Sequence, residues 1–286
     1  MVSDKFLTLS DGYKYAYADQ GEGDPLLMVH GNPTWSYYYR NLIKTFSPTF
    51  RCVAPDHIGC GNSDKPQDYP YRLEKHIQNL EYLVEKLDLK DITLVIHDWG
   101  GAIGMGMATR HPERIKRIVI LNTAAFLMDR IPFRINICRI PVFGAIAIRG
   151  FNAFAASATF MAVHDKMSSE VKKEYVRPYN NWKNRIATLR FVQDIPMSPS
   201  HPTWSTVREI EEKLSLFKNT PKLLCWGMED FCFNEDFLAR WREIYPDAIV
   251  RLYRRAGHYV LEDSWEDIVY DMETFFKKDK EKEEVL

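Results

Sequence analysis

Residues 95–101, which read VIHDWGG, place a carboxylate directly after a hydrophobic run. A carboxylate in such a position costs free energy unless it is hydrogen-bonded or takes part in chemistry. Gly100 and Gly101 closely follow Asp98, as a sharp turn from a strand into a helix requires, so Asp98 has the place of a nucleophile. Because Ile96 replaces the first glycine of the motif Gly-x-Ser-x-Gly, the match is partial, and a helix N-cap is the alternative role for Asp98.

A second motif, residues 30–35 (HGNPTW), follows another hydrophobic run. In α/β-hydrolases the residue after such a His-Gly pair donates a backbone N–H to an oxyanion hole, and so does the residue after the nucleophile. Those residues are Asn32 and Trp99 in this chain. We expect His30 itself to form structural hydrogen bonds. One His-Gly pair is a weak signal, but the two motifs together are strong evidence for nucleophilic catalysis.

A nucleophile of this kind needs an acid and then a histidine later in the chain. His258 meets the second requirement. Two positions in the sequence could provide the acid that orients its imidazole. One follows the strand that ends in Asn122 and Thr123 and holds no carboxylate, and the other follows the next strand and holds Glu229 and Asp230. We predict Asp230 as the acid, with Glu229 as the alternative and a surface turn as the non-functional reading of Asp230.

The elements that must position these residues follow from hydrophobic patterning. Short apolar runs predict strands, and apolar residues at helical spacing predict helices between them. This alternation, after an antiparallel start, predicts an α/β-hydrolase fold with a mostly parallel central sheet flanked by helices. Strands are expected at residues 5–9, 14–19, 25–31, 50–59, 92–98, 115–123, 221–227 and 248–258. Helices are expected at residues 32–46, 72–89, 101–111, 234–245 and 264–278.

The alternation of strands and helices is interrupted between about residue 129 and residue 218. Prolines, aromatic residues and helix-like segments dominate there, and no buried strand is evident. The simplest organisation is a helical cap, residues 129–218, inserted between a first core part (residues 1–128) and a second one (residues 219–286). The cap is expected to set the size of the substrate.

Residues 131–163 are unusually apolar. The longest uncharged piece has 15 residues, fewer than the roughly 18–20 that a membrane span needs, so no transmembrane segment is predicted. The favoured reading is that these helices cover a core or a pocket. The alternative is an exposed apolar surface for a lipid-like substrate, a membrane face or a partner. Candidate pocket-lining residues, each equally readable as core, are Phe154, Phe160, Met161 and Ile195.

Composition narrows the class of protein further. The 286 residues carry a net charge of −1, so no overall field favours a nucleic acid as partner. The five cysteines are scattered, which indicates reduced thiols in a cytoplasmic protein. The N-terminus has early charges and no apolar stretch, so it does not resemble a signal peptide. No metal or cofactor motif is found, and Gly100-Gly101-x-x-Gly104 is not a dinucleotide fingerprint.

Four segments together resemble the haloalkane dehalogenases over most of the chain, and least in the cap: HGNPTWSYYYRNL, PDHIGCGNSDKP, HDWGGAIGMGMA and WGMEDFCF. The resemblance implies a nucleophilic Asp98, a catalytic pair of Asp230 and His258, and a halide site formed by Asn32 and Trp99. The position of the acid, combined with the Asn–Trp pair, resembles the third subgroup of that family. This subgroup is close to the bacterial β-lactone decarboxylases of olefin biosynthesis.

The resemblance implies a haloalkane dehalogenase-type hydrolase without a cofactor. Asp98 would displace halide from an alkyl carbon, and water activated by His258 and Asp230 would hydrolyse the resulting ester to an alcohol. The partners would be a small apolar substrate, either a haloalkane or a long-chain β-lactone, and a halide product. The apolar cap is the feature that suggests a homo-oligomer or another assembly.

Three other readings stay open. The main alternative is a β-lactone decarboxylase that forms a cis-olefin and carbon dioxide. A weaker one is an epoxide hydrolase with Tyr175 and Tyr179 as donors to the epoxide oxygen. The last is a scaffold without turnover, against which the presence of Asp98, Asp230 and His258 argues.

Overall fold

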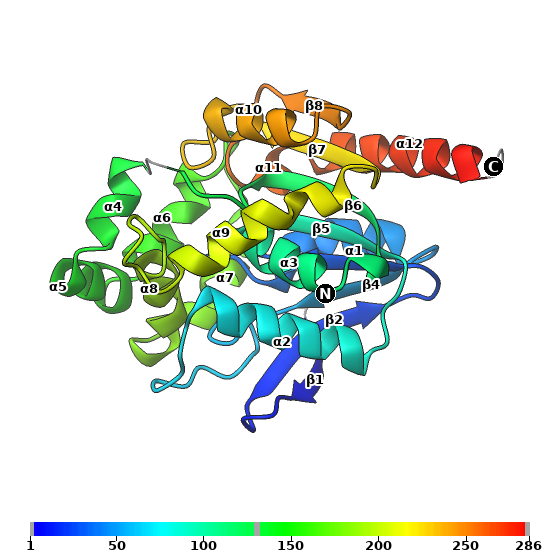
Figure 1. Cartoon of the computed structure of the whole chain (residues 1–286). Coiled ribbons are helices and arrows are strands. Elements are labelled where there is room, and N and C mark those ends of the chain that lie inside the picture. The colour runs from blue at the N-terminus through cyan, green and yellow to red at the C-terminus, as the bar shows by residue number, and fades with distance from the viewer. Residues whose placement is uncertain (1–2, 129–131, 284–286) are drawn as a thin grey trace.

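The computed structural model of the protein describes residues 3–128 and 132–283. An eight-stranded sheet in the order β1-β2-β4-β3-β5-β6-β7-β8 forms its centre (Figure 1). β2 runs antiparallel to both of its neighbours and the remaining pairs are parallel, which confirms the predicted fold class. The strands are β1 (Lys5–Thr8), β2 (Lys14–Gln20), β3 (Pro25–Val29), β4 (Arg51–Pro55), β5 (Ile92–Asp98), β6 (Ile115–Thr123), β7 (Lys222–Gly227) and β8 (Ile249–Tyr253).

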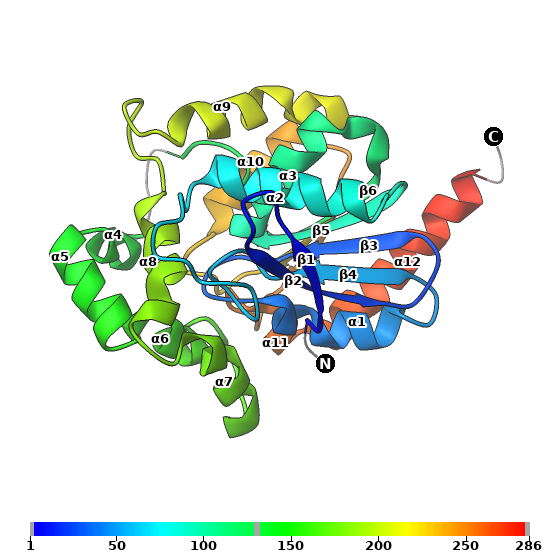
Figure 2. The same ribbon diagram turned by 90° about the horizontal axis from the view of Figure 1, so that it is seen from below.

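Helices cover both faces of the sheet (Figure 2). One face packs against α2, α3, α9 and α10, and the other against α1, α11 and α12. Successive residues of a strand point to opposite faces, so Leu94 and Ile96 of β5 join the first hydrophobic cluster while Val95 joins the second. The helices are α1 (Arg40–Phe46), α2 (Leu73–Lys86), α3 (Trp99–Arg110), α9 (Trp204–Lys213), α10 (Glu235–Ile244), α11 (Val260–Asp263) and α12 (Trp265–Glu283).

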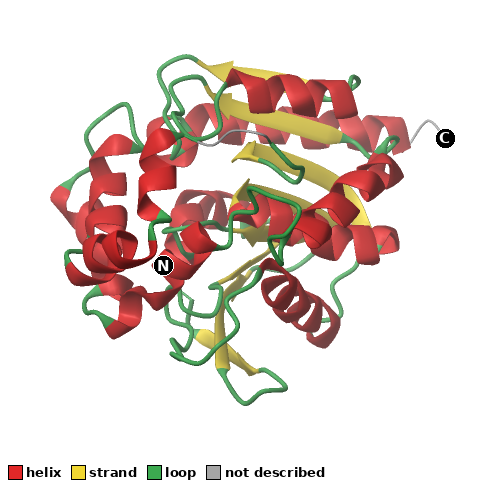
Figure 3. Ribbon diagram, turned by 60° about the vertical axis from the view of Figure 1, so that its left-hand side comes forward, coloured by secondary structure: helices red, strands yellow, loops and turns green. Residues whose placement is uncertain are grey.

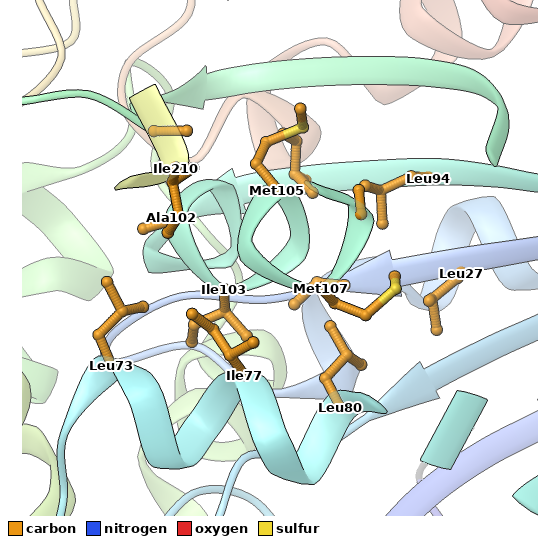
Figure 4. Close-up of a cluster of buried hydrophobic side chains, with 14 of the residues drawn as sticks. Leu27, Leu73, Ile77, Leu80, Leu94, Ala102, Ile103, Met105, Met107 and Ile210 are labelled. Carbon is orange, nitrogen blue, oxygen red and sulfur yellow. The ribbon is translucent and has the colours of Figure 1, made fainter. Parts of the chain in front are cut away.

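The sharp turn from β5 into α3, at Asp98, is called the elbow below. The helix α3 that begins there is fixed by close packing against α2. Leu73, Ile77 and Leu80, the apolar stripe of α2, point toward Ile103 and Met107 of α3 (Figure 4). All five side chains are fully buried. This packing holds the start of α3, and therefore the end of β5, in a fixed place.

A group of helices lies between β6 and α9, to one side of the sheet (Figures 1 and 3). We call α4 to α8, residues 133–193, the cap helices. They are α4 (Phe133–Cys138), α5 (Pro141–Gly144), the π-helical segment η3 (Ala145–Gly150), α6 (Ala153–Met161), α7 (Ser169–Val176) and α8 (Ile186–Gln193). Within the described residues no single helix is long and apolar enough to cross a membrane, and one pair bent by 70°, Val142–Gly150 with Ala153–Met161, passes that test only when taken together.

The predicted division into three parts stays a prediction. The start of the predicted cap, residues 129–131, lies outside the described residues. Near its predicted end, α9 buries Val207 and Ile210 in the same cluster as α2 and α3, so this helix packs over the sheet.

The last predicted strand is longer than the observed one. Residues 248–258 were expected to be extended, but β8 ends at Tyr253. The chain then leaves the sheet, and the backbone N–H of Gly257 donates to the carboxylate of Asp263 at 2.8 Å instead of joining the ladder. His258 therefore lies on a loop, where its side chain can turn toward β5.

Candidate active site

Asp98 is the last residue of β5 and stands immediately before α3. Its backbone has φ +51° and ψ −127°, a conformation that non-glycine residues rarely adopt. The turn is possible because Gly100 and Gly101 have no side chain. A Cβ at Gly100 would collide with the carbonyl oxygen of Val29, and one at Gly101 with the side chain of Thr123. The carboxylate of Asp98 makes no capping hydrogen bond to α3, so the N-cap alternative does not describe this side chain.

The carboxylate of Asp98 instead faces the loops that follow β3 and β8. Its Oδ1 accepts the backbone N–H of Asn32 at 2.6 Å, and its Oδ2 lies 3.5 Å from Nε2 of His258. Gly31 has to be a glycine, because a Cβ there would collide with the carboxylate. The N–H predicted for an oxyanion hole is thus already directed at the aspartate that would carry an ester.

The buried acid beside His258 is Asp230. Nδ1 of His258 donates to Oδ2 of Asp230 at 2.8 Å, and Oδ1 of Asp230 accepts the backbone N–H of Cys232 at 2.6 Å. The alternative acid, Glu229, points away and pairs with Nδ1 of His164 at 2.7 Å. The structure therefore brings together Asp98, His258 and Asp230 and leaves Glu229 outside the cluster.

The end of β6, the other position considered for the acid, has a structural role. Asn122, near the end of β6, accepts the backbone N–H of Gly227 at 2.8 Å and donates its amide N–H to the carbonyl of the same residue at 3.0 Å. This double contact ties β6 to β7, directly before the loop that carries Asp230. A carboxylate at residue 122 could accept but not donate, so it could not make this pair of bonds.

Electrostatics couple His258 to both carboxylates. Burial alone would lower the pKa of His258, but the charges and hydrogen bonds of Asp230 and Asp98 outweigh it and raise the pKa to about 10. Burial raises the pKa of Asp98, yet the hydrogen bond and charge of His258 and the N–H of Asn32 bring it below its ordinary value. These interactions favour the charged form of the imidazole of His258.

The predicted anion-binding pair, Asn32 and Trp99, borders the same cavity as Asp98. One N–H of the Asn32 side-chain amide donates to the carbonyl of Thr188 in α8 at 3.2 Å. The amide has a second N–H available for a ligand. The indole of Trp99 packs against Phe191 of α8, with ring centroids 5.4 Å apart. Both donors are neutral, so they can bind a leaving anion without forming an ion pair with Asp98.

The cavity has a volume of about 340 Å³ and a mostly apolar wall. Asp98 and His258 are the only charged residues among the described residues that line it. Of the predicted lining residues, Phe154, Met161 and Ile195 are present. The prediction for Phe160 is wrong, because its side chain lies on the outer side of α6 and is 63% exposed.

The core contributes lining residues that the sequence did not reveal. Phe233 stacks on His258 with ring centroids 5.6 Å apart, and Phe126, Val207 and Phe237 add to the wall. Their hydrophobic character alone could not distinguish them from ordinary core residues.

The two tyrosines of the epoxide-hydrolase alternative are engaged elsewhere. Tyr175 donates its hydroxyl to Glu262 at 2.5 Å, and Tyr179 donates to the carbonyl of Thr34 at 3.2 Å. Neither is among the residues that line the cavity, so the geometry does not support epoxide opening by this pair. His30 has the structural role expected of it, since its Nε2 accepts the backbone N–H of His57 at 3.0 Å.

A mostly parallel sheet with an aspartate at the elbow and a buried acid–histidine pair defines an α/β-hydrolase with a carboxylate at the nucleophile position. The sequence model of the family described as alpha/beta hydrolase fold matches residues 24–136. The chain is 48% identical over 272 residues to the cis-3-alkyl-4-alkyloxetan-2-one decarboxylase of Shewanella oneidensis, a match that covers 93% of this chain and 86% of the relative. It is 31% identical over 253 residues to haloalkane dehalogenase 2 of Mycobacterium tuberculosis, with 87% and 86% covered.

A solved structure shows the same relationship. The haloalkane dehalogenase DatA from Agrobacterium tumefaciens C58 superposes with a TM-score of 0.86 at 26% identity, covering 96% of this chain and 97% of that one. The chain therefore belongs to the α/β-hydrolase family that contains the haloalkane dehalogenases and the cis-3-alkyl-4-alkyloxetan-2-one decarboxylases. An oxetan-2-one is a β-lactone, so the resemblance stated from the sequence is confirmed on both sides.

Proposed function

We propose that this protein converts a cis-3,4-dialkyl β-lactone into a cis-olefin and carbon dioxide. The observation that carries this choice is the 48% identity to a decarboxylase of that substrate class, against 31% identity to a haloalkane dehalogenase. The site geometry suits both reactions. The higher identity supports decarboxylation as the first candidate, with dehalogenation as the second.

In the first step, the carboxylate of Asp98 attacks the ring carbon that bears the ring oxygen. That carbon–oxygen bond breaks, the four-membered ring opens, and the carbon is inverted. The ring oxygen leaves as part of a carboxylate, which the side-chain N–H groups of Asn32 and Trp99 would hold. The product of this step is an ester of Asp98 with a free carboxylate on the neighbouring carbon.

In the second step, the bond to the carboxylate carbon breaks and its electron pair forms the carbon–carbon double bond. Asp98 leaves with the electrons of its own bond to the substrate, and carbon dioxide is released. Inversion followed by anti elimination keeps the two alkyl groups on one side, which gives the cis-olefin. The backbone N–H of Asn32 and the charged His258 lie beside the carboxylate that is re-formed on Asp98.

The charge of His258 is compatible with the decarboxylation. A hydrolytic base has to be a neutral imidazole, whereas neither step of the decarboxylation removes a proton. In the free enzyme the pKa of His258 is raised to about 10 by Asp230 and Asp98, against the effect of burial. The group is therefore suited to stabilising the carboxylate of Asp98.

Haloalkane dehalogenation is the second candidate, and the combination of Asp98, His258 and Asp230 with Asn32 and Trp99 favours it. Asp98 would displace halide to form an alkyl ester, and a water deprotonated by His258 would attack the ester carbonyl. Esterification removes one of the two carboxylates that raise the pKa of His258. The pKa should therefore fall in the intermediate, toward the neutral form that hydrolysis needs.

A direct competition tests the proposal. The pure enzyme is given a cis-dialkyl β-lactone and a 1-bromoalkane of similar length in parallel, and olefin and bromide are measured. We expect olefin release to have the higher kcat/KM. Efficient bromide release without any olefin would contradict the proposal and favour the second candidate.

Several attributes of the protein stay proposals. We infer a cytoplasmic location from the cysteines, all five of which are unpaired. The roles of Asp98, His258, Asp230, Asn32 and Trp99 are inferred from their geometry and await the variants described below. A halide product belongs to the second candidate function, and a homo-oligomer formed through the cap stays open.

A further inference from the structure

Helix α6 is apolar on both of its sides. One side faces the cavity through Phe154, Ala158 and Met161. The opposite side carries Ala156 and Phe160, which are exposed. A helix on the surface of a protein normally presents a polar outer face. The outer face of α6 therefore lacks the polar side chains that a water-exposed helix normally carries.

The exposed apolar residues of the protein gather at this place. We call Ile140, Val142, Phe143, Ile146, Phe151 and Phe160 the apolar tip. These six are the majority of the eleven large hydrophobic side chains that are exposed among the described residues. Val142 is 72% exposed and Phe151 is 78% exposed. α5 and α6, which flank this surface, lie at the end of the molecule farthest from α12 (Figures 1 and 2). Concentrated exposure of this kind marks an interaction site.

Charge is distributed just as unevenly. Residues 133–193, the cap helices, contain ten Lys or Arg and three Asp or Glu, a net charge of +7. The rest of the chain contains 28 basic and 36 acidic residues, a net charge of −8. Between residues 132 and 164 there is no acidic residue at all. The net charge of the whole chain is close to zero because these two opposite charges nearly cancel.

Several cationic groups lie close to the apolar tip. The guanidinium of Arg149 stacks on Trp182 with 4.6 Å to the ring centroid, and Arg185 donates to the carbonyl of Gly150 at 2.9 Å. Burial and the like charge of Arg190 lower the pKa of Arg149, as expected for cations held close together. Apolar side chains beside cations and a tryptophan are the composition of a surface that binds at the lipid–water interface.

We propose that the apolar tip docks on the surface of an anionic lipid bilayer. The apolar side chains would enter the boundary between headgroups and acyl chains, and the surrounding Arg and Lys residues would contact the phosphates. A second copy of the chain is a poorer occupant, because it would bring two segments of net charge +7 toward each other.

Docking would also place the cavity next to a store of apolar substrate. The helix α6 would separate the bilayer from the cavity, with one side in contact with each. This consequence for turnover rests on the proposed function, whereas the binding to lipid does not, and the two can be tested separately.

The first experiment measures binding alone. The full-length protein is sedimented with vesicles of phosphatidylcholine, or of phosphatidylcholine with phosphatidylglycerol, at low and high salt and without any substrate. We expect cosedimentation with the anionic vesicles that weakens as salt rises. Equal partition to both kinds of vesicle, or none to either, would overturn the proposal, whatever reaction the enzyme catalyses.

A matched pair of variants locates the surface. Replacing three residues of the apolar tip should lower the vesicle partition coefficient by about tenfold or more, because the buried apolar area is lost. Three exposed residues of the core provide the control, which should bind as the wild type does. The test variant is Phe143→Ser/Phe151→Ser/Phe160→Ser, and the control variant is Phe6→Ser/Leu216→Ser/Tyr270→Ser.

A second pair tests the role of charge. Lys183→Gln/Arg190→Gln should weaken binding to the anionic vesicles severalfold, while Lys277→Gln/Lys278→Gln on α12 should not. Unchanged binding by both the Phe143/Phe151/Phe160 variant and the Lys183/Arg190 variant would overturn the proposal. So would a self-association or a protein complex that depends on the tip in the absence of vesicle binding.

Discussion

The elbow at the end of β5 and the cap helices that cover it are built in opposite ways. At the elbow, Asp98, Asp230 and His258 are fixed by short hydrogen bonds, two of which come from the backbone. On the cap side, the cavity is bounded by apolar side chains of α4 and α6. Directional bonds hold the reacting groups to a fraction of an ångström, whereas apolar contacts fix only volume. We therefore expect the elbow to determine the type of reaction and the cap to determine the range of substrates.

The elbow should be the more sensitive region, and Asp98→Asn should have the largest effect. The amide is a poor nucleophile, so both olefin and bromide release should fall by at least about 10⁴-fold. Product release by the purified variant measures this, with circular dichroism to check the fold. Turnover within tenfold of the wild type would mean that Asp98 is not the nucleophile.

Two neighbouring carboxylates provide a sharper test of the elbow. Asp230→Asn should lower kcat by about 10²–10³-fold, because His258 loses both its orientation and its stabilising charge. Glu229→Gln is the matched control and should stay close to the wild type, since Glu229 contacts His164 and not His258. Steady-state kinetics of the two variants measure this difference. Equal losses of kcat in both variants would contradict the assignment of Asp230 as the acid.

The pH dependence should separate the two reactions at the elbow. Hydrolysis of an alkyl ester needs neutral His258, so bromide turnover limited by that step should rise by up to about tenfold per pH unit below the pKa of His258 in the ester. That pKa lies below the value of about 10 in the free enzyme, because the charge of Asp98 is gone. Olefin release should not rise in this way. A parallel increase of both products would show that the olefin route also needs a base.

The cap should respond with smaller effects that depend on substrate. Ala158→Phe fills part of the cavity wall and should raise KM about tenfold for a long-chain substrate while sparing a short one. Ala156→Phe, two residues away on the exposed side of α6, is the matched control and should change neither. Kinetics across a series of chain lengths measure the difference. A loss that is equal at every length would indicate a disturbed elbow instead.

The contact between cap and core should give the smallest effect. A hydrogen bond from Glu229 raises the pKa of His164, so the folded state binds this proton more tightly than the unfolded state does. Any stabilisation is thus present below the unfolded pKa and is lost as pH rises through the folded pKa. The melting temperature of Glu229→Gln should fall slightly below that of the wild type at acidic pH and converge with it at alkaline pH. A gap that widens with pH would contradict this coupling.

Much of the fold and half of the site follow from local sequence. The helix α2 is predicted by the spacing of Leu73, Ile77 and Leu80, because one face of a helix recurs every three to four residues. The elbow is predicted by Asp98 and by the two glycines that follow Trp99, because only small residues fit where that turn meets β3 and β6. Both patterns can be read from short stretches of sequence, although the contacts that require the two glycines come from β3 and β6.

The remainder depends on residues far apart in the chain. Whether Asp230 or Glu229 meets His258 is decided by the loop after β7, since adjacent side chains point in different directions. Phe154 lines the cavity while Phe160 faces outward, although both are apolar residues of the same helix. The apolar character of a side chain indicates that it can be buried, but it does not indicate which residues or which cavity it will contact.

The sequence by itself predicted Asp98 as the nucleophile and Asn32 and Trp99 as the donors, because each lies in a short motif of adjacent residues. Only the tertiary structure decided which acid orients His258, which faces of the cap helices meet the cavity, and that charge and exposed apolar area gather at one end of the molecule. These properties come from elements that are distant in sequence and adjacent in space, and no local pattern specifies where such elements meet.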